Sequence, residues 1–101
     1  MPKSFEDLVK NSTLPVFVDF WADWCGPCRA VAPAVKQLAE EFSGKIVVVK
    51  IDIDEQPGVA GRYKIQGVPT LMIFRNGEVI WRTSGAIPYS QLKAQVTKAL
   101  S

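Results

Sequence analysis

The chain has 101 residues, of which 48% are hydrophobic and 22% charged, and its formal net charge is +2. This length fits one domain over residues 1–101, and the near-average composition excludes an intrinsically disordered chain. The small positive charge is spread along the sequence, so no nucleic-acid partner is predicted. No apolar run reaches the ~20 residues that span a bilayer, so no membrane partner is predicted either.

Two residue types narrow the chemistry further, because the chain has two cysteines and no histidine. Without histidine it cannot build a Cys-His or Ser-His nucleophile or complete a Cys/His zinc finger, and no metal site is predicted. A secreted disulfide framework would use more cysteines at wider spacing. The first seven residues lack the apolar stretch of a secretory signal, so the expected compartment is the cytoplasm.

The first predicted elements are a helix and a strand. Ser4 followed by Asp7 fits a helix N-cap with an acid three residues later, although a frayed terminus fits the same residues. Residues 15–21 are predicted as a strand whose two faces are both largely apolar. Such a strand belongs in the centre of a sheet that is covered on both sides.

A long helix is predicted to begin at Cys25 and to end near Phe42. Pro27 suits the first turn of a helix, where its missing N–H is not needed, and apolar residues recur at helical spacing up to Phe42. Pro33 lies inside this apolar stripe and is expected to kink the helix. Gly44 then ends it.

The rest of the chain alternates strands and helices. Residues 46–51 form a valine-rich strand, which the intervening helix places parallel to the first strand. Residues 54–64 indicate turns around a short helix. Two strands, a hairpin dipeptide and a last helix follow, at residues 70–74, 78–83, Asn76-Gly77 and 89–100. The predicted fold class is α/β, with one four-stranded mixed sheet flanked by helices on both faces.

Cys25 and Cys28 are separated by two residues at the predicted start of the long helix. Unpaired N–H groups and the macrodipole at a helix N-terminus favour an anion, so the pKa of the Cys25 thiol is expected below the ~8.5 of a free cysteine. Cys25 is then the nucleophile, and Cys28, a turn deeper and less exposed, resolves the mixed disulfide. The alternatives are half of a metal site that two chains share, or two inert buried thiols.

Asp19 stands in the otherwise apolar first strand, six residues before Cys25. Burial of an ionised carboxylate costs several kcal/mol, so the pKa of Asp19 is expected to rise. A carboxylate with a raised pKa at this end of the strand can take the proton from Cys28 during resolution. The alternative is an aspartate at the edge of the strand that faces water, but Phe17 and Trp21 share its face and favour burial.

The segment around the cysteines, F-W-A-D-W-C-G-P-C-R over residues 20–29, closely resembles the active-site segment of the thioredoxins. The similarity continues through Ala32-Pro33, residues 50–54, residues 67–70 and Asn76-Gly77, so it covers nearly the whole chain. This resemblance implies the thioredoxin fold and a protein-disulfide reductase with no bound cofactor. The implied partners are disulfide-containing target proteins, with a thioredoxin reductase as electron donor.

The resemblance also implies roles for residues around the cysteines. Gly26 and Pro27, which separate the cysteines, fit a reductant better than a disulfide-forming oxidase or isomerase. Asp19 matches the family's buried aspartate and Lys50 the neighbouring lysine, although a lysine that protects an exposed strand edge fits the same position. The implied substrate-binding residues are Trp24 in a docking surface, Val68-Pro69 with a cis bond that faces the cysteines, and the groove loop Gly85-Ala86.

The chain departs from the family pattern at its start, where only Met1-Pro2-Lys3 precede Ser4 in place of an N-terminal strand. The expected order of strands across the sheet is therefore residues 46–51, 15–21, 70–74 and 78–83. The edge at residues 46–51 is then open. We expect a monomer when dilute, with two copies pairing edge to edge at high concentration.

Ser84 is a second departure, because the family often has an apolar groove residue there. It leaves the substrate preference open. A competing function is that of a binding module that serves as a rigid subunit of another complex. The presence of both cysteines and Asp19 argues against binding as the sole role.

Overall fold

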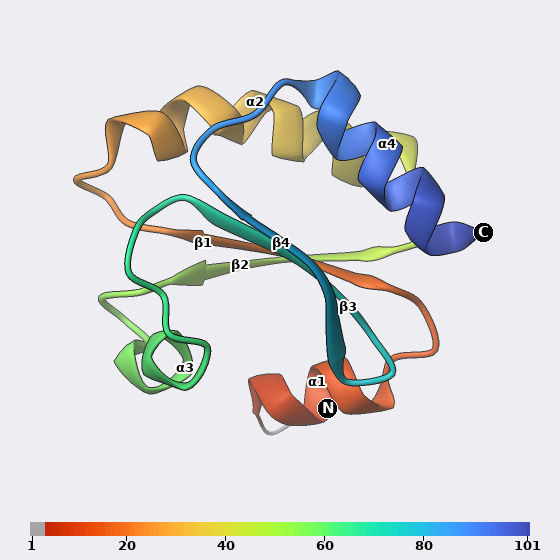
Figure 1. Cartoon of the computed structure of the whole chain (residues 1–101), viewed down its shortest axis with the longest axis horizontal. Coiled ribbons are helices and arrows are strands. Elements are labelled where there is room, and N and C mark those ends of the chain that lie inside the picture. Colours follow the sequence, from red (N-terminus) through yellow and green to blue (C-terminus); the bar gives the residue numbers. More distant parts are fainter. Residues whose placement is uncertain (1–3) are drawn as a thin grey trace.

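The computed structural model describes residues 4–101, which form a four-stranded mixed sheet with helices on both faces (Figure 1). The order across the sheet is β2-β1-β3-β4, with β2 parallel to β1 and the other neighbours antiparallel. The order, the parallel β1–β2 pair and the antiparallel β3–β4 hairpin are as predicted, whereas the direction of β3 relative to β1 was not predicted. The elements are α1 (Phe5–Asn11), β1 (Val16–Trp21), α2 (Gly26–Glu41), β2 (Val47–Asp52), α3 (Pro57–Arg62), β3 (Thr70–Arg75), β4 (Glu78–Ser84) and α4 (Tyr89–Leu100).

The central strand β1 is covered on both sides, which confirms the prediction from its two apolar faces. Val16, Val18 and Phe20 pack on one side with α1 and with residues of β2 and β3. Phe17 packs on the other side with buried residues of α2 and α4. Figure 1 shows the same layers, with α2 and α4 above the sheet and α1 and α3 below it. Two apolar layers therefore hold β1 in place.

The helix ends follow the capping signals in the sequence. Ser4 caps α1, since its Oγ accepts a hydrogen bond of 3.2 Å from the backbone N–H of Asp7. Cys25 is the N-cap of α2, which continues through Pro33 and ends at the C-cap Phe42. Only residues 22–25 connect the C-terminal end of β1 to the start of α2. This short connection fixes the positions of both cysteines relative to the sheet.

The β3–β4 hairpin turns at the predicted dipeptide. Asn76 and Gly77 have φ values of 54° and 83°, the left-handed conformation that a two-residue hairpin turn requires at both positions. The pairing of β3 and β4 contains an irregularity between Ile73 and Phe74, which the sequence pattern did not predict.

The outer edge of β2 has no strand beside it among residues 4–101, in agreement with the expected order. The expectation that residues 1–3 carry no strand lies outside the described residues. Within the described part of the chain, no helix is long and apolar enough to cross a membrane.

Candidate functional site

The two cysteines form a disulfide where β1 leads into α2, with their Cα atoms 5.3 Å apart. Cys25 is the last residue before the helix and Cys28 lies in its first turn, so the helix itself sets the separation of the two side chains. The pair can therefore exist as a small disulfide ring or, after reduction, as two neighbouring thiols.

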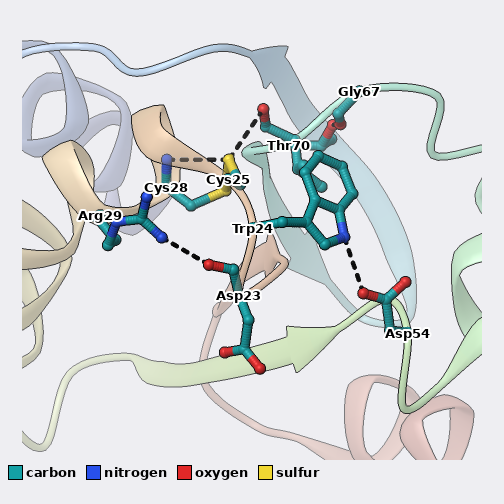
Figure 2. The surroundings of a disulfide bond; sticks show 9 residues. Asp23, Trp24, Cys25, Cys28, Arg29, Asp54, Gly67 and Thr70 are labelled. Carbon is teal, nitrogen blue, oxygen red and sulfur yellow. Dashed lines mark hydrogen bonds between the residues drawn. A yellow bond between two sulfur atoms is a disulfide. The ribbon is translucent and has the colours of Figure 1, made fainter.

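The surroundings of the Cys25 sulfur favour a negative charge. Its Sγ accepts a hydrogen bond of 3.1 Å from the backbone N–H of Cys28, one of the free donors of the first turn of α2 (Figure 2). Such a donor, together with the helix macrodipole, favours a negative charge at the position of this sulfur. This geometry is what the helix-start position of Cys25 predicts.

The prediction that Cys28 is the less exposed cysteine is wrong for the disulfide form. Cys25 is 3% exposed and Cys28 is 5% exposed. The reason is a loop far away in the sequence: the carbonyl oxygen of Val68 lies 3.4 Å from Cys25 Sγ, and Val68 packs against the small cluster that contains the cysteines. Exposure therefore does not distinguish the two sulfurs, whereas their places at the helix N-terminus do.

Asp19 is buried, at 1% exposed, on the face of β1 that looks toward α2. Burial raises its pKa to about 6, and the nearby positive charge of Lys50 opposes part of this rise. Its Oδ1 has no hydrogen-bond partner among the described residues. Asp19 and Cys28 line the same cavity of about 170 Å³. The water-facing alternative for Asp19 is excluded.

Lys50 sits opposite Asp19 in the register of β1 and β2. Its Nζ lies 5.3 Å from the centre of the Trp21 ring, a cation–π distance, and Lys50 lines the cavity with Asp19 and Cys28. It also stands on the outer strand of the sheet. The two interpretations of Lys50 are therefore compatible, because the same side chain lies beside the buried acid and on the open edge.

The loop before β3 faces the cysteines, and its Val68-Pro69 bond is cis. Gly85, just after β4, donates its N–H to the Pro69 carbonyl oxygen at 2.8 Å, which joins the two predicted groove loops. The Thr70 hydroxyl donates to the Gly67 carbonyl oxygen at 2.6 Å and holds the other end of the loop. Backbone groups of this loop are thus presented beside the Cys25 sulfur.

Trp24 stands at the outer rim of the site and is 66% exposed. Its indole Nε1 donates a hydrogen bond of 2.9 Å to Asp54 Oδ2, which fixes the ring beside the disulfide (Figure 2). On the other side, Arg29 donates to the Asp23 carbonyl oxygen at 2.6 Å. An exposed aromatic ring held by a hydrogen bond offers an apolar surface to a docking chain at a low cost in side-chain entropy.

Comparison with known proteins agrees with this geometry. The family model described as thioredoxin matches residues 1–98. The chain belongs to the thioredoxin family. It is 56% identical over 100 residues to "Thioredoxin 1" of Chlorobaculum tepidum, a match that covers 99% of each protein. It is 50% identical to "Thioredoxin" of Porphyra purpurea over 97% of this chain and 92% of the relative.

A plant relative is also similar. "Thioredoxin M-type, chloroplastic" of Spinacia oleracea is 48% identical over 97% of this chain and 54% of its own length. With the family established, the activity class follows: the chain is a thiol-disulfide oxidoreductase, and the Cys25–Cys28 pair fits the active-site pattern of two cysteines separated by two residues.

Several predicted residues of this thioredoxin-family site have no side-chain contact that defines a role. Gly26 and Pro27 are exposed at the start of α2, and Ala86 is exposed after Gly85. Ser84, the departure from the family pattern, lies with its Oγ 3.4 Å from Thr70 Oγ1. The hydroxyl is thus part of a polar contact beside the groove loops instead of an apolar surface.

Asp54 and Thr70 were not singled out by sequence reasoning, although each positions a part of the site. Asp54 N donates to Asp52 Oδ1 at 2.9 Å, a turn that the D-I-D run at the end of β2 could have indicated. The role of Thr70 depends on a loop conformation that no local pattern reveals. Among residues 4–101, no group of three or more Cys, His, Asp or Glu side chains could hold a metal ion.

Proposed function

We propose that this chain is a protein-disulfide reductase in which Cys25 is the attacking nucleophile and Cys28 the resolving thiol. The observation that carries the proposal is the position of Cys25 Sγ at the N-terminus of α2, where it accepts the Cys28 N–H at 3.1 Å. Cys28 already uses its backbone to stabilise the neighbouring sulfur. The Cys28 thiol must lose its proton before it can attack. Asp19 lines the same cavity and is the base that we propose for this step.

The proposed reaction has two exchange steps. The Cys25 thiolate attacks one sulfur of the target disulfide, forms a mixed disulfide and releases the other target sulfur as a thiolate. Cys28 then loses its proton to the Asp19 carboxylate and attacks Cys25 Sγ, which forms the Cys25–Cys28 disulfide and releases the second target thiol. Two electrons pass to the target, and the two thiols of the chain are oxidised.

The proposed substrate is an extended segment of a target protein that carries an accessible disulfide. Trp24, Val68, Pro69, Gly85 and Ala86 would form the docking surface around Cys25. Supporting this, the Val68 carbonyl oxygen lies 3.4 Å from the Cys25 sulfur, so a segment that pairs with the backbone of this loop would pass directly over the sulfur. Gly26, Pro27 and Lys50 would tune the redox potential.

The experiment that tests the roles of the two sulfurs is the reduction of insulin disulfides with dithiothreitol as electron source. Cys25→Ser should abolish turnover and form no adduct. Cys28→Ser should also stop turnover but accumulate a mixed disulfide with insulin, visible by mass spectrometry without reductant. The two variants are matched controls, since each removes one sulfur from the same ring. Full turnover in the Cys25→Ser protein would overturn the assignment.

A measurement of the redox potential separates a reductase from an oxidase or isomerase. We expect a potential more negative than about −200 mV, in the range of cytosolic reductants. A much more oxidising value would favour disulfide formation instead. We also propose a thioredoxin reductase as electron donor and the cytoplasm as compartment, since a protein that donates electrons to disulfides needs a pool that keeps its own pair reduced.

We further propose that the whole chain acts as one domain and as a monomer when dilute. Two copies would associate through the outer edge of β2 only at high concentration, since this edge lacks a neighbouring strand among residues 4–101. Sedimentation at rising concentration, with amide exchange followed along residues 46–51, tests this point. A stable dimer at micromolar concentration would contradict it.

A further inference from the structure

The outer edge of β2 borders a groove that the proposed reaction does not use. This groove has a volume of about 710 Å³ and lies between the flank of α2 and the strand. Its wall is mostly apolar: Ala32, Pro33 and Ala39 come from the helix and Val48 from the strand. Val47 and Val49 lie on the other face of β2, away from the groove, and are half-buried there. Apolar side chains are thus accessible on both faces of this edge.

The backbone of β2 leaves hydrogen-bonding groups at the same place. Val47 N donates to the Pro15 carbonyl oxygen and Ile53 N to the Trp21 carbonyl oxygen, each at 3.0 Å. Alternate residues of a parallel strand direct their backbone groups to opposite sides, so the odd-numbered residues of β2 pair with β1. Val48 and Lys50 therefore direct their N–H and C=O groups outward, where the described residues provide no strand.

The charge at the groove has one sign. Three of its lining residues, Arg29, Lys36 and Lys50, are cationic, and no carboxylate lines it among residues 4–101. A second copy would bring the same cations to the same edge, so like charges would meet across the pair. A segment with acidic side chains would instead place each carboxylate near a lysine or arginine while its backbone pairs with β2.

We propose that the outer edge of β2 and its groove bind an extended segment of a partner protein in which β-branched apolar residues alternate with acidic ones. The segment adds a fifth strand to the sheet through the backbone of Val48 and Lys50. Its apolar side chains lie beside Val47 and Val49 on one face. Its acidic side chains lie on the other face, with their carboxylates at Arg29, Lys36 and Lys50.

This surface is separate from the docking surface around Cys25 but adjoins the redox site. The groove shares Arg29, Ala32 and Lys50 with the cavity that Asp19 and Cys28 line. A partner held at β2 therefore lies against the flank of the site. The proposal does not depend on the direction of electron transfer, because binding can be measured in the disulfide form.

The probe is an eight-residue peptide of alternating valine and glutamate with blocked ends, titrated to millimolar concentration against the ¹⁵N-labelled full chain. We expect amide shifts along β2 and slower hydrogen exchange at Val48 and Lys50. A peptide of alternating valine and lysine is the control for charge. Equal binding of both peptides, or shifts confined to the surroundings of Trp24 and Val68, would overturn the proposal.

Two variants sharpen the test. Lys36→Glu should weaken binding of the acidic peptide by roughly fivefold, as expected for loss of one partly exposed ion pair. Lys10→Glu is the matched control, since it changes the net charge equally from an exposed position on α1. Binding that falls equally in both variants would contradict a local contact. Insulin reduction should be unchanged in either variant.

Val48→Pro tests the backbone contact. It removes an N–H that faces outward, so the ladder with β1 stays intact while peptide binding should be lost. Retained circular dichroism and insulin reduction would verify the fold, and unchanged peptide binding would overturn strand addition. Two results with no peptide present would also overturn the proposal. Slow exchange at Val48 and Lys50 in dilute protein would mean that the chain covers its own edge. Slowing that already sets in at micromolar protein concentration would mean that a second copy occupies the edge in dilute solution.

Discussion

The two faces of β1 contrast sharply in how completely their side chains are satisfied. On the face toward α1, Val16, Val18 and Phe20 join a cluster of buried apolar side chains, in which aromatic rings meet edge to face. On the face toward α2, Phe17 packs equally well, but the next two side chains leave Asp19 Oδ1 and Trp21 Nε1 without partners in the described structure. One strand thus has an apolar cluster on one face and two buried polar atoms without partners on the other.

The comparison shows where a small protein can hold a buried polar group that lacks a hydrogen-bond partner. A buried carboxylate with an unsatisfied oxygen destabilises the fold, and it persists only where the surrounding structure holds it in place. The residues next to Asp19 in β1 belong to the apolar layer on the opposite face of the strand, and this layer provides that support. Substitutions on the two faces should therefore change different measured properties. Those on the face toward α1 should change stability alone, and those on the face toward α2 should also change its pH dependence and the rate of disulfide exchange.

The largest expected effect is on the apolar face. Phe20→Ala should lower the free energy of unfolding by about 3–5 kcal/mol, because Phe20 is fully buried and contacts the ring of Phe5. The pH dependence of the free energy of unfolding should be the same in this variant as in the parent chain. Denaturant unfolding at several pH values measures both. Phe20→Leu, a milder change, keeps the test valid if the alanine variant does not fold.

The next effect concerns Asp19 and has a defined sign. Its pKa rises from the model-compound value of 3.8 to about 6 on folding, so the native state holds the proton more tightly than the unfolded chain. The contribution of Asp19 to stability is therefore lost as pH rises from about 4 to about 6, and the loss saturates above that. A shift of this size corresponds to about 3 kcal/mol.

Asp19→Ala should remove this pH dependence and make the protein more stable at neutral pH. It should also slow the resolution of mixed disulfides, because Cys28 loses the proton acceptor proposed above. A direct NMR titration that places the Asp19 pKa at or below its ordinary value would contradict the proposed role.

The smallest effect lies on the exposed rim. Asp54→Asn should change the free energy of unfolding by less than about 1 kcal/mol, because the bond from Trp24 Nε1 lies in solvent and gives little net stability. It should nevertheless loosen the indole, which the chemical shift of its N–H proton reports. Trp24→Phe is the complementary variant. A large loss of stability in either would mean that the rim, like the apolar face, holds the fold.

Much of the fold could be predicted because its signals are local. The helix cap at Ser4, the hairpin at Asn76-Gly77 and the two apolar faces of β1 each determine their own segment, and the parallel crossover then orders the strands. The burial of Asp19 followed in the same way from the neighbours on its face. The cysteine pair could be recognised from its spacing and from its place at the start of a predicted helix.

The features that escaped prediction all depend on contacts between distant segments. The equal burial of the two cysteines arises from the Val68 loop, 43 residues beyond Cys25. The bond between Trp24 and Asp54 spans 30 residues, and the groove beside β2 exists only once α2 lies on the sheet. Local patterns contain no information about such distances.

A buried acid with a pKa of about 6 also affects how the whole molecule migrates in an electric field. The formal charge of +2 counts all ten acidic side chains as ionised, so the protonated form of Asp19 brings it to +3. Histidine, which normally changes a protein's charge near this pH, does not occur in the chain. The step in electrophoretic mobility across pH 6 should therefore carry a large contribution from one interior proton. Its disappearance in the Asp19→Ala protein would let a surface measurement report the state of the core.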